Sequence, residues 1–142
     1  MPMTNYQTNA YKETRVKTAG QGQIIVMLYD EAIKQIGYAV KLLDENSKEL
    51  DKVNNAIMKA RDIITELMVS LDMEQGGEFA TRMFAVYQWF SEQLIQANLK
   101  KETQPLRQVK DMMSEIREAW NQIAGKTNVE GSDGRSGVNI AG

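Results

Sequence analysis

A short segment rich in acidic residues and glycine, SLDMEQGGEFA at residues 70–80, lies between two apolar runs. Asp72, Glu74 and Glu78 carry the carboxylate oxygens that calcium prefers. A calcium loop of the EF-hand type needs oxygen ligands at positions 1, 3 and 5 and a Glu at position 12. Counted from Asp72, position 5 is Gly76 and position 12 is Met83, so the pattern fails. The spacing argues against a metal site.

Acid–base catalysis by the same carboxylates needs a pocket that raises the pKa of one partner, and a solvent-facing corner does not supply one. We interpret the segment as the corner between two helices. Leu71 ends the first helix, and Gly76 or Gly77 allows a positive φ. The acids then lie near the N-terminus of the next helix, where the helix dipole favours them. Met73 is expected to pack on the bundle end or to border a binding groove.

Composition restricts the chemistry further. The 142-residue chain has no Cys and no His, which excludes disulfides, thiol nucleophiles, zinc fingers and Ser-His-Asp triads. Its net charge of −2 gives no basic excess for nucleic acid. No apolar run is long enough for membrane insertion, and the N-terminus lacks a signal-peptide core. We expect a cytoplasmic protein without metal, cofactor or enzymatic activity. An enzyme using only carboxylates, Tyr, Lys or Ser is the alternative that a pocket of converging acids would support.

Apolar residues recur at three- and four-residue spacing in four segments, about 24–43, 51–71, 77–98 and 105–124. Pro105 suits the first turn of the last helix, and Gly125 suits its end. Four helices of similar length with short connections favour an all-α fold, an antiparallel up-down four-helix bundle. The predicted domain covers residues 1–125, and its first 20 residues form a mobile N-terminal arm or cap. Residues 126–142, glycine-rich and polar, are predicted to be a disordered tail.

Helical periodicity also separates core positions from surface positions. Phe79 and Ile123 fall on the buried stripes of the third and fourth helices, whereas Val26 and Leu42 fall outside the first stripe.

Several large apolar side chains of the second and third helices lie outside the core stripes. They are Met58 and Val69 on the second helix, and Phe84, Trp89 and Ile95 on the third. Single exposed apolar residues are common, but several on two helices indicate grooves that accept an apolar segment of a partner.

Three segments resemble the flagellar secretion chaperone family FliS, the cytoplasmic chaperones of flagellin. They are NAYKETRVKTA at 9–19, IIVMLYDEAI at 24–33 and ARDIITELMVSLDMEQGGEFA at 60–80. QANLKKE and IREAW fit the later helices of the family, so the resemblance runs from about residue 5 to residue 123. MLYD and SLDME-GGE, in this order and at this separation, are the specific motifs.

The resemblance implies a four-helix bundle with a non-enzymatic binding role. Such a chaperone holds the C-terminal segment of unpolymerised flagellin, prevents premature filament assembly and delivers the subunit to the flagellar type III export apparatus. Export-gate components and regulatory proteins are implied as secondary partners. The alternative is a helical-bundle adaptor that binds an amphipathic helix of another partner.

One departure from the family pattern concerns the start of the first helix. The family opens this helix with TAS and a proline followed by Glu, whereas Thr18-Ala19 is followed here by GQGQ at 20–23. Without the Ser cap and the proline, we expect the first helix to start later or to fray, and the arm to be held less firmly.

The candidate partner-binding residues combine the off-stripe positions with the family motifs. Tyr11 and Val16 are apolar points of the arm, for which capping of the bundle end is the other interpretation. Ile64, Leu67 and Leu71 belong to the core stripe, and their outer edges would line a groove. The full set is Tyr11, Val16, Met58, Ile64, Leu67, Val69, Leu71, Met73, Phe84, Trp89 and Ile95.

Overall fold

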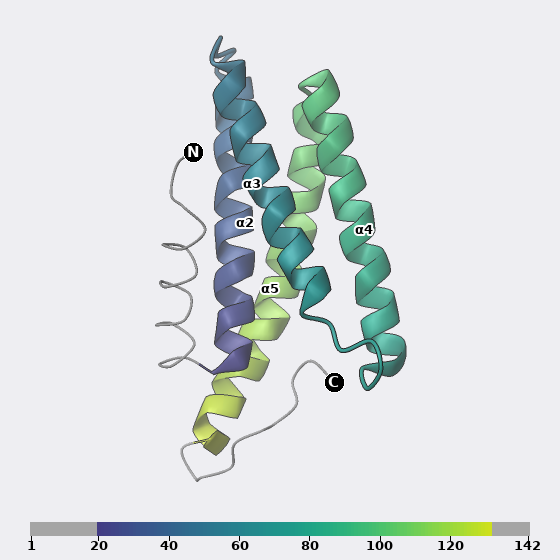
Figure 1. Cartoon of the computed structure of the whole chain (residues 1–142). Helices are drawn as coiled ribbons and strands as arrows, with labels where there is room; N and C mark the ends of the chain where they lie inside the picture. The colour runs from purple at the N-terminus through teal and green to yellow at the C-terminus, as the bar shows by residue number, and fades with distance from the viewer. Residues whose placement is uncertain (1–19, 132–142) are drawn as a thin grey trace, which may run out of the picture.

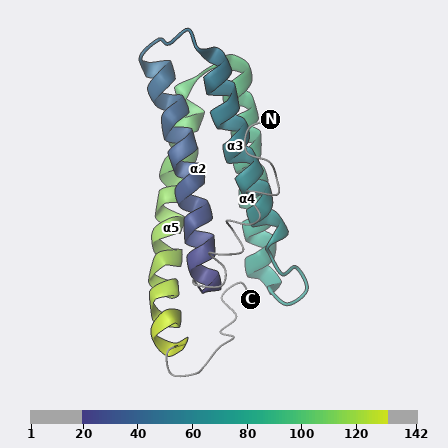
Figure 2. The same ribbon diagram turned by 60° about the vertical axis from the view of Figure 1, so that its left-hand side comes forward.

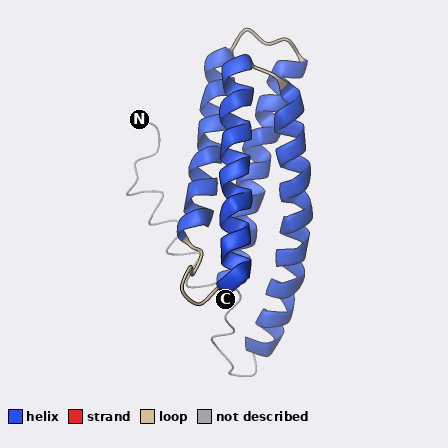
Figure 3. Cartoon of the chain, turned by 90° about the vertical axis from the view of Figure 1, so that its right-hand side faces the viewer, coloured by secondary structure: helices blue, strands red, loops and turns tan. Residues whose placement is uncertain are grey.

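The computed structural model describes residues 20–131, with side chains described for residues 20–125, as four helices that run alternately up and down (Figure 1). The helices are α2 (Gln21–Asp44), α3 (Leu50–Val69), α4 (Gly77–Lys100) and α5 (Thr103–Gly131). Figure 3 shows helices joined by short loops throughout this part of the chain. The predicted all-α, antiparallel up-down four-helix bundle is confirmed.

The four helices close a ring in which each packs on the next and α5 returns to α2. Figure 2 shows α2 and α5 side by side along much of their length. α2 packs closely on both α3 and α5, whereas α4 packs less extensively on its two neighbours. α2 and α4 therefore face each other across a diagonal of the bundle.

The core fills the space between the four helices with one contiguous cluster of apolar side chains. Its largest fully buried members are Tyr29, Ile36, Val53, Ile57, Ile64, Leu67, Tyr87, Phe90, Leu94, Leu106, Val109 and Met113. Within each helix they are three, four or seven residues apart, the spacing of one helical face that the sequence predicts.

The predicted stripes are wrong at four positions. Val26 and Leu42 are buried, because α2 is covered by helices on both sides and its buried arc is wider than one stripe. Phe79 and Ile123 are 42% and 43% exposed. The Phe79 ring packs edge-on against Trp120, with ring centroids 6.1 Å apart. Ile123 belongs to the C-terminal part of α5, the helix that extends beyond α2 at this end (Figure 1).

The first helix does not start late. α2 begins at Gln21, and no side chain caps it at Gly20. The carbonyl of Gly20 accepts hydrogen bonds from the amides of Gln23 and Ile24 at 3.0 and 3.1 Å. Gly22 is already buried, so packing of the first turn compensates for the missing cap. The arm at residues 1–19, with Tyr11 and Val16, lies outside the described residues.

The last helix does not stop at Gly125. α5 continues to Gly131, and residues 126–131 of the predicted disordered tail are helical. A glycine inside a helix costs only about 1 kcal/mol relative to alanine. Burial of Trp120 and Ala124 just before it offsets that cost. Residues 132–142 lie outside the described residues, and the division at residue 125 stays a prediction.

Two buried tyrosines join α2 and α4 across the diagonal. The hydroxyl oxygens of Tyr29 and Tyr87 lie 2.7 Å apart, and their ring centroids are 6.4 Å apart. Both side chains are at least 98% buried, so each hydroxyl is satisfied by the other rather than by bulk water. Burial raises the pKa of Tyr29 far above its ordinary value of 10, and burial also raises the pKa of Tyr87.

These pKa shifts predict a loss of stability in alkali. The folded state keeps both hydroxyls protonated above pH 10, whereas the unfolded chain ionises its tyrosines near pH 10. The unfolded state then binds fewer protons, so stability falls as the pH rises above about 10, by up to about 1.4 kcal/mol per pH unit for each buried tyrosine. Urea unfolding measured between pH 8 and pH 11 checks this fall.

The matched control is the double variant Tyr29→Phe, Tyr87→Phe, which keeps both rings. Its stability should fall less steeply above pH 10, because neither buried position can ionise in the unfolded chain. An equally steep fall in the double variant would assign the alkaline sensitivity to other groups.

Candidate functional site

The corner between α3 and α4 is closed by its own backbone and by Asp72. Asp72 Oδ1 accepts hydrogen bonds from the amides of Glu74 and Gln75, at 3.1 and 2.9 Å. The carbonyl of Asp72 accepts a third from Gly76 at 2.7 Å. Gly77 has a φ of +57° and begins α4. The prediction that SLDMEQGGEFA is a helix–helix corner is therefore confirmed, with Gly77 as the glycine of positive φ.

The corner shows no arrangement of acids for chemistry. Among residues 20–125, no group of three or more Asp, Glu, His or Cys side chains is placed to hold a metal ion. Glu78 lies in the first turn of α4 and pairs with Arg82 at 3.4 Å, on the exposed surface. No described helix is long and apolar enough to cross a membrane.

The predicted partner-binding residues separate by exposure. Ile64 and Leu67 are buried in the core, which favours their interpretation as core residues. Three of the set are largely exposed: Met58 at 45%, Met73 at 48% and Val69 at 80%. The half-buried members are Leu71, Phe84, Trp89 and Ile95. Val69, Leu71 and Met73 lie together along the chain at the corner, and the others lie along α3 and α4.

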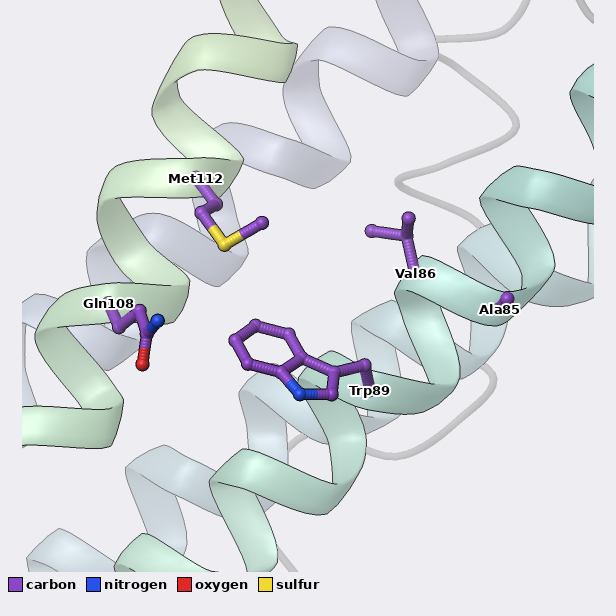
Figure 4. Close-up of a pocket in the computed structure, with 5 residues that line it drawn as sticks. All are labelled: Ala85, Val86, Trp89, Gln108 and Met112. Carbon is purple, nitrogen blue, oxygen red and sulfur yellow. The ribbon is translucent and has the colours of Figure 1, made fainter.

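One flank of α4 forms an apolar groove with α5 (Figure 4). The groove has a volume of about 380 Å³ and is lined by Ala85, Val86 and Trp89 of α4 and by Gln108 and Met112 of α5. In Figure 4 the Trp89 indole extends from α4 towards Gln108 and Met112. Its ring also packs against Phe90 of the core, with centroids 5.9 Å apart. No charged side chain lines the groove, so it fits apolar side chains of a partner.

Sequence reasoning found Trp89 but not its partners in the groove. Met112 directly precedes the core residue Met113, and therefore faces about 100° away from it. Gln108 lies one helical turn before Met112, on the same side of α5. A search of the fourth helix for apolar residues beside the core stripe would have identified Met112.

The other flank of α4 faces α3, and we call it the α3–α4 face: Met58 of α3 and Phe84 and Ile95 of α4. A hydrogen bond from Asn98 Nδ2 to Asn54 Oδ1, 2.7 Å long, fixes the register of the two helices. In this register Met58 of α3 lies at the level of Ile95 of α4, since antiparallel helices have equal rise. The predicted Met58, Phe84 and Ile95 thus share one side of the bundle.

Charged residues close the opposite side of the bundle. Arg117 of α5 donates two hydrogen bonds to Asp30 of α2, at 2.8 and 3.3 Å. Arg107 of α5 pairs with Asp44 of α2 further along the same contact. The α2–α5 contact is therefore bridged by ion pairs, whereas apolar side chains are left partly open to solvent on both flanks of α4.

Comparison with known proteins identifies close relatives of the chain. The model of the family described as Flagellar protein FliS matches residues 3–127. The chain is similar to the flagellar secretion chaperone FliS of Salmonella typhimurium, with 35% identity over 84% of this chain and 88% of the relative. It is also similar to the proteins of the same name from Bacillus subtilis, with 32% identity over 80% and 82% of the two chains, and Escherichia coli, with 31% over 78% and 80%.

We predict that Asp72→Ala destabilises the protein by about 0.5–2 kcal/mol, because two backbone amides of the corner lose their acceptor. Asp72→Asn, which keeps an acceptor oxygen, should lose less. Chemical unfolding of both variants measures the difference. Equal stability of Asp72→Ala and wild type would show that water replaces the carboxylate without cost.

Proposed function

The chain belongs to the FliS family of flagellar proteins, and we propose that it is a cytoplasmic export chaperone that binds the C-terminal segment of unpolymerised flagellin. By holding this segment, it prevents premature filament assembly and delivers the subunit to the flagellar type III export apparatus. The relatives that support this proposal are named flagellar secretion chaperones. Export-gate components and regulatory proteins are proposed as secondary partners.

The observation that carries the proposal is the apolar surface on both flanks of α4. One flank forms the groove with α5, and the other forms the α3–α4 face. A folded partner domain would meet one flank at a time, because α4 itself stands between them. A segment without its own fold can pass around α4 and place apolar side chains on both flanks.

Coupled folding and binding suits the task of an export chaperone. The segment gives up conformational entropy when it folds on the bundle, and this cost offsets part of the contact free energy. The complex is then specific without being too stable to release its cargo. Nine methionines in the chain, Met112 among them, add adaptable apolar surface for such a partner.

The uncharged α4–α5 groove would also accept an amphipathic helix of an unrelated protein, so a helical-bundle adaptor is the alternative function. Purification from lysate of cells that make flagellin separates the two. A stoichiometric complex with flagellin supports the chaperone, and recovery without flagellin supports the adaptor.

We predict that the last roughly 40 residues of the cognate flagellin bind the protein with a strongly negative heat-capacity change, the mark of apolar burial and folding on binding. The double variant Phe84→Asp, Trp89→Asp places a charge on each flank of α4 and should weaken binding by about tenfold or more. Calorimetric titration at several temperatures measures both quantities.

Tyr38→Asp is the matched control. Tyr38 is 43% exposed, as an apolar site of the binding surface would be, but it lies on α2, diagonally opposite α4. The Tyr38→Asp variant should therefore bind the flagellin segment with wild-type affinity. Met58→Asp, at a position 45% exposed, gives a single substitution that the fold tolerates if the double variant is unstable. Wild-type affinity in a folded double variant would mean that the flanks of α4 are not the binding surface.

A further inference from the structure

Arg61 of α3 differs from the other arginines whose side chains are described. Its Nε atom is buried, and it has no hydrogen-bond partner among residues 20–125. Arg82, Arg107 and Arg117 each pair with a carboxylate. Residue spacing alone does not single out Arg61, because the lack of a partner for its Nε depends on which residues surround it in the fold.

The register of α3 and α4 places Arg61 beside the α3–α4 face. Asn54 bonds to Asn98, and two turns further along, about 10 Å, the same sides of the two helices carry Arg61 and Ser91. Two turns beyond that level, the same sides carry Met68 on α3 and Phe84 on α4. Met58 lies one turn from Arg61, at the level of Ile95. Along the two helices, Arg61 therefore stands between the level of Met58 and Ile95 on one side and the level of Phe84 on the other.

A buried donor without a partner costs free energy, and more so when it is charged. The planar guanidinium fork matches a carboxylate, and such a pair is stronger where apolar groups exclude water. Ser91, at the same level on α4, carries no charge that would neutralise Arg61. An anionic group of a bound segment would supply the partner that Arg61 Nε lacks among residues 20–125.

We propose that the flagellin segment bound on the α3–α4 face presents a carboxylate to Arg61, between apolar side chains that contact Met58 and Ile95 on one side and Phe84 on the other. The inference rests on the proposed chaperone function and specifies its ligand. Two sources have this chemistry, an Asp or Glu side chain of the segment and the carboxylate at the end of its chain.

The positions of these residues along α3 also set a spacing in the ligand. The apolar contact at Met58 lies about 4.5 Å along the helix axis from Arg61, and the contact at the level of Met68 and Phe84 lies about 10 Å away in the other direction. A helical ligand that follows α3 would carry its acid about three residues from one apolar anchor and about seven from the other.

The test is calorimetric titration of the full chain with a synthetic peptide of the last roughly 40 residues of the cognate flagellin. Arg61→Met keeps an apolar stem and removes the charge, and it should weaken binding by about 10- to 100-fold. The affinity of Arg61→Lys should lie between those of wild type and Arg61→Met, because lysine keeps the charge but lacks the planar guanidinium that binds a carboxylate through two hydrogen bonds. Arg82→Met is the control and should bind as wild type, since the Arg82 side chain is 78% exposed and paired with Glu78.

Variants of the peptide identify the carboxylate. Each Asp or Glu is changed in turn to its amide, and a further peptide carries an amidated C-terminus. The partner of Arg61 is the group whose neutralisation weakens binding to wild type but weakens binding to Arg61→Met no further. An effect of the C-terminal amide alone assigns the chain terminus, and an effect at one residue assigns that side chain.

Thermal unfolding of the free protein confirms that Arg61→Met is folded. Its midpoint should equal or exceed that of wild type, because an unpaired buried donor is removed. If Arg61→Met binds the peptide with wild-type affinity while Phe84→Asp loses binding, the proposed contact between Arg61 and a carboxylate is wrong, but the chaperone function still stands. The proposed contact would also be wrong if Arg61→Met binds more weakly but every neutralised peptide loses as much affinity for Arg61→Met as for wild type. A peptide that fails to bind wild type would overturn the proposed function and this inference with it.

Discussion

The hydrogen bond between the Tyr29 and Tyr87 hydroxyls lies in the buried core and joins α2 to α4, the two helices that face each other across the bundle. Two buried hydroxyls must each find a partner, and here they find each other, 2.7 Å apart. The two side chains reach towards each other across the diagonal, and their rings are tilted, with centroids 6.4 Å apart. Phe90 packs beside Tyr87, with ring centroids 6.4 Å apart, and fills the space next to the pair.

The position of α4 has a consequence for the surface. α2 packs closely on α3 and α5, and ion pairs of Arg107 and Arg117 bridge its contact with α5. α4 packs less fully on its neighbours, and apolar side chains on its two flanks remain partly exposed. Closer contacts of α4 with α3 and α5 would bury more of these side chains. On α3, Arg61 has a buried Nε without a hydrogen-bond partner among residues 20–125.

Periodicity in the sequence predicted the four helices, their order and the corner at SLDMEQGGEFA, because these depend on local spacing and turn chemistry. It failed where neighbouring elements decide the outcome. Gly125 reads as a helix stop, but the packing of α5 carries the helix through it. Val26 lies off the main stripe, but two flanking helices bury it. Trp89 could be identified as an off-stripe residue, whereas the groove it lines with Met112 depends on how α4 meets α5.

The proposed binding of the flagellin segment along both flanks of α4 is tested most directly by the methyl signals of the methionines in an NMR spectrum of the ¹³C-methyl-labelled protein. Met58 lies on the α3–α4 face and Met112 in the α4–α5 groove, whereas Met27 lies on α2. On addition of the C-terminal segment of the cognate flagellin, the signals of Met58 and Met112 should both shift. A spectrum in which Met27 shifts while Met58 and Met112 stay unchanged would contradict binding at α4.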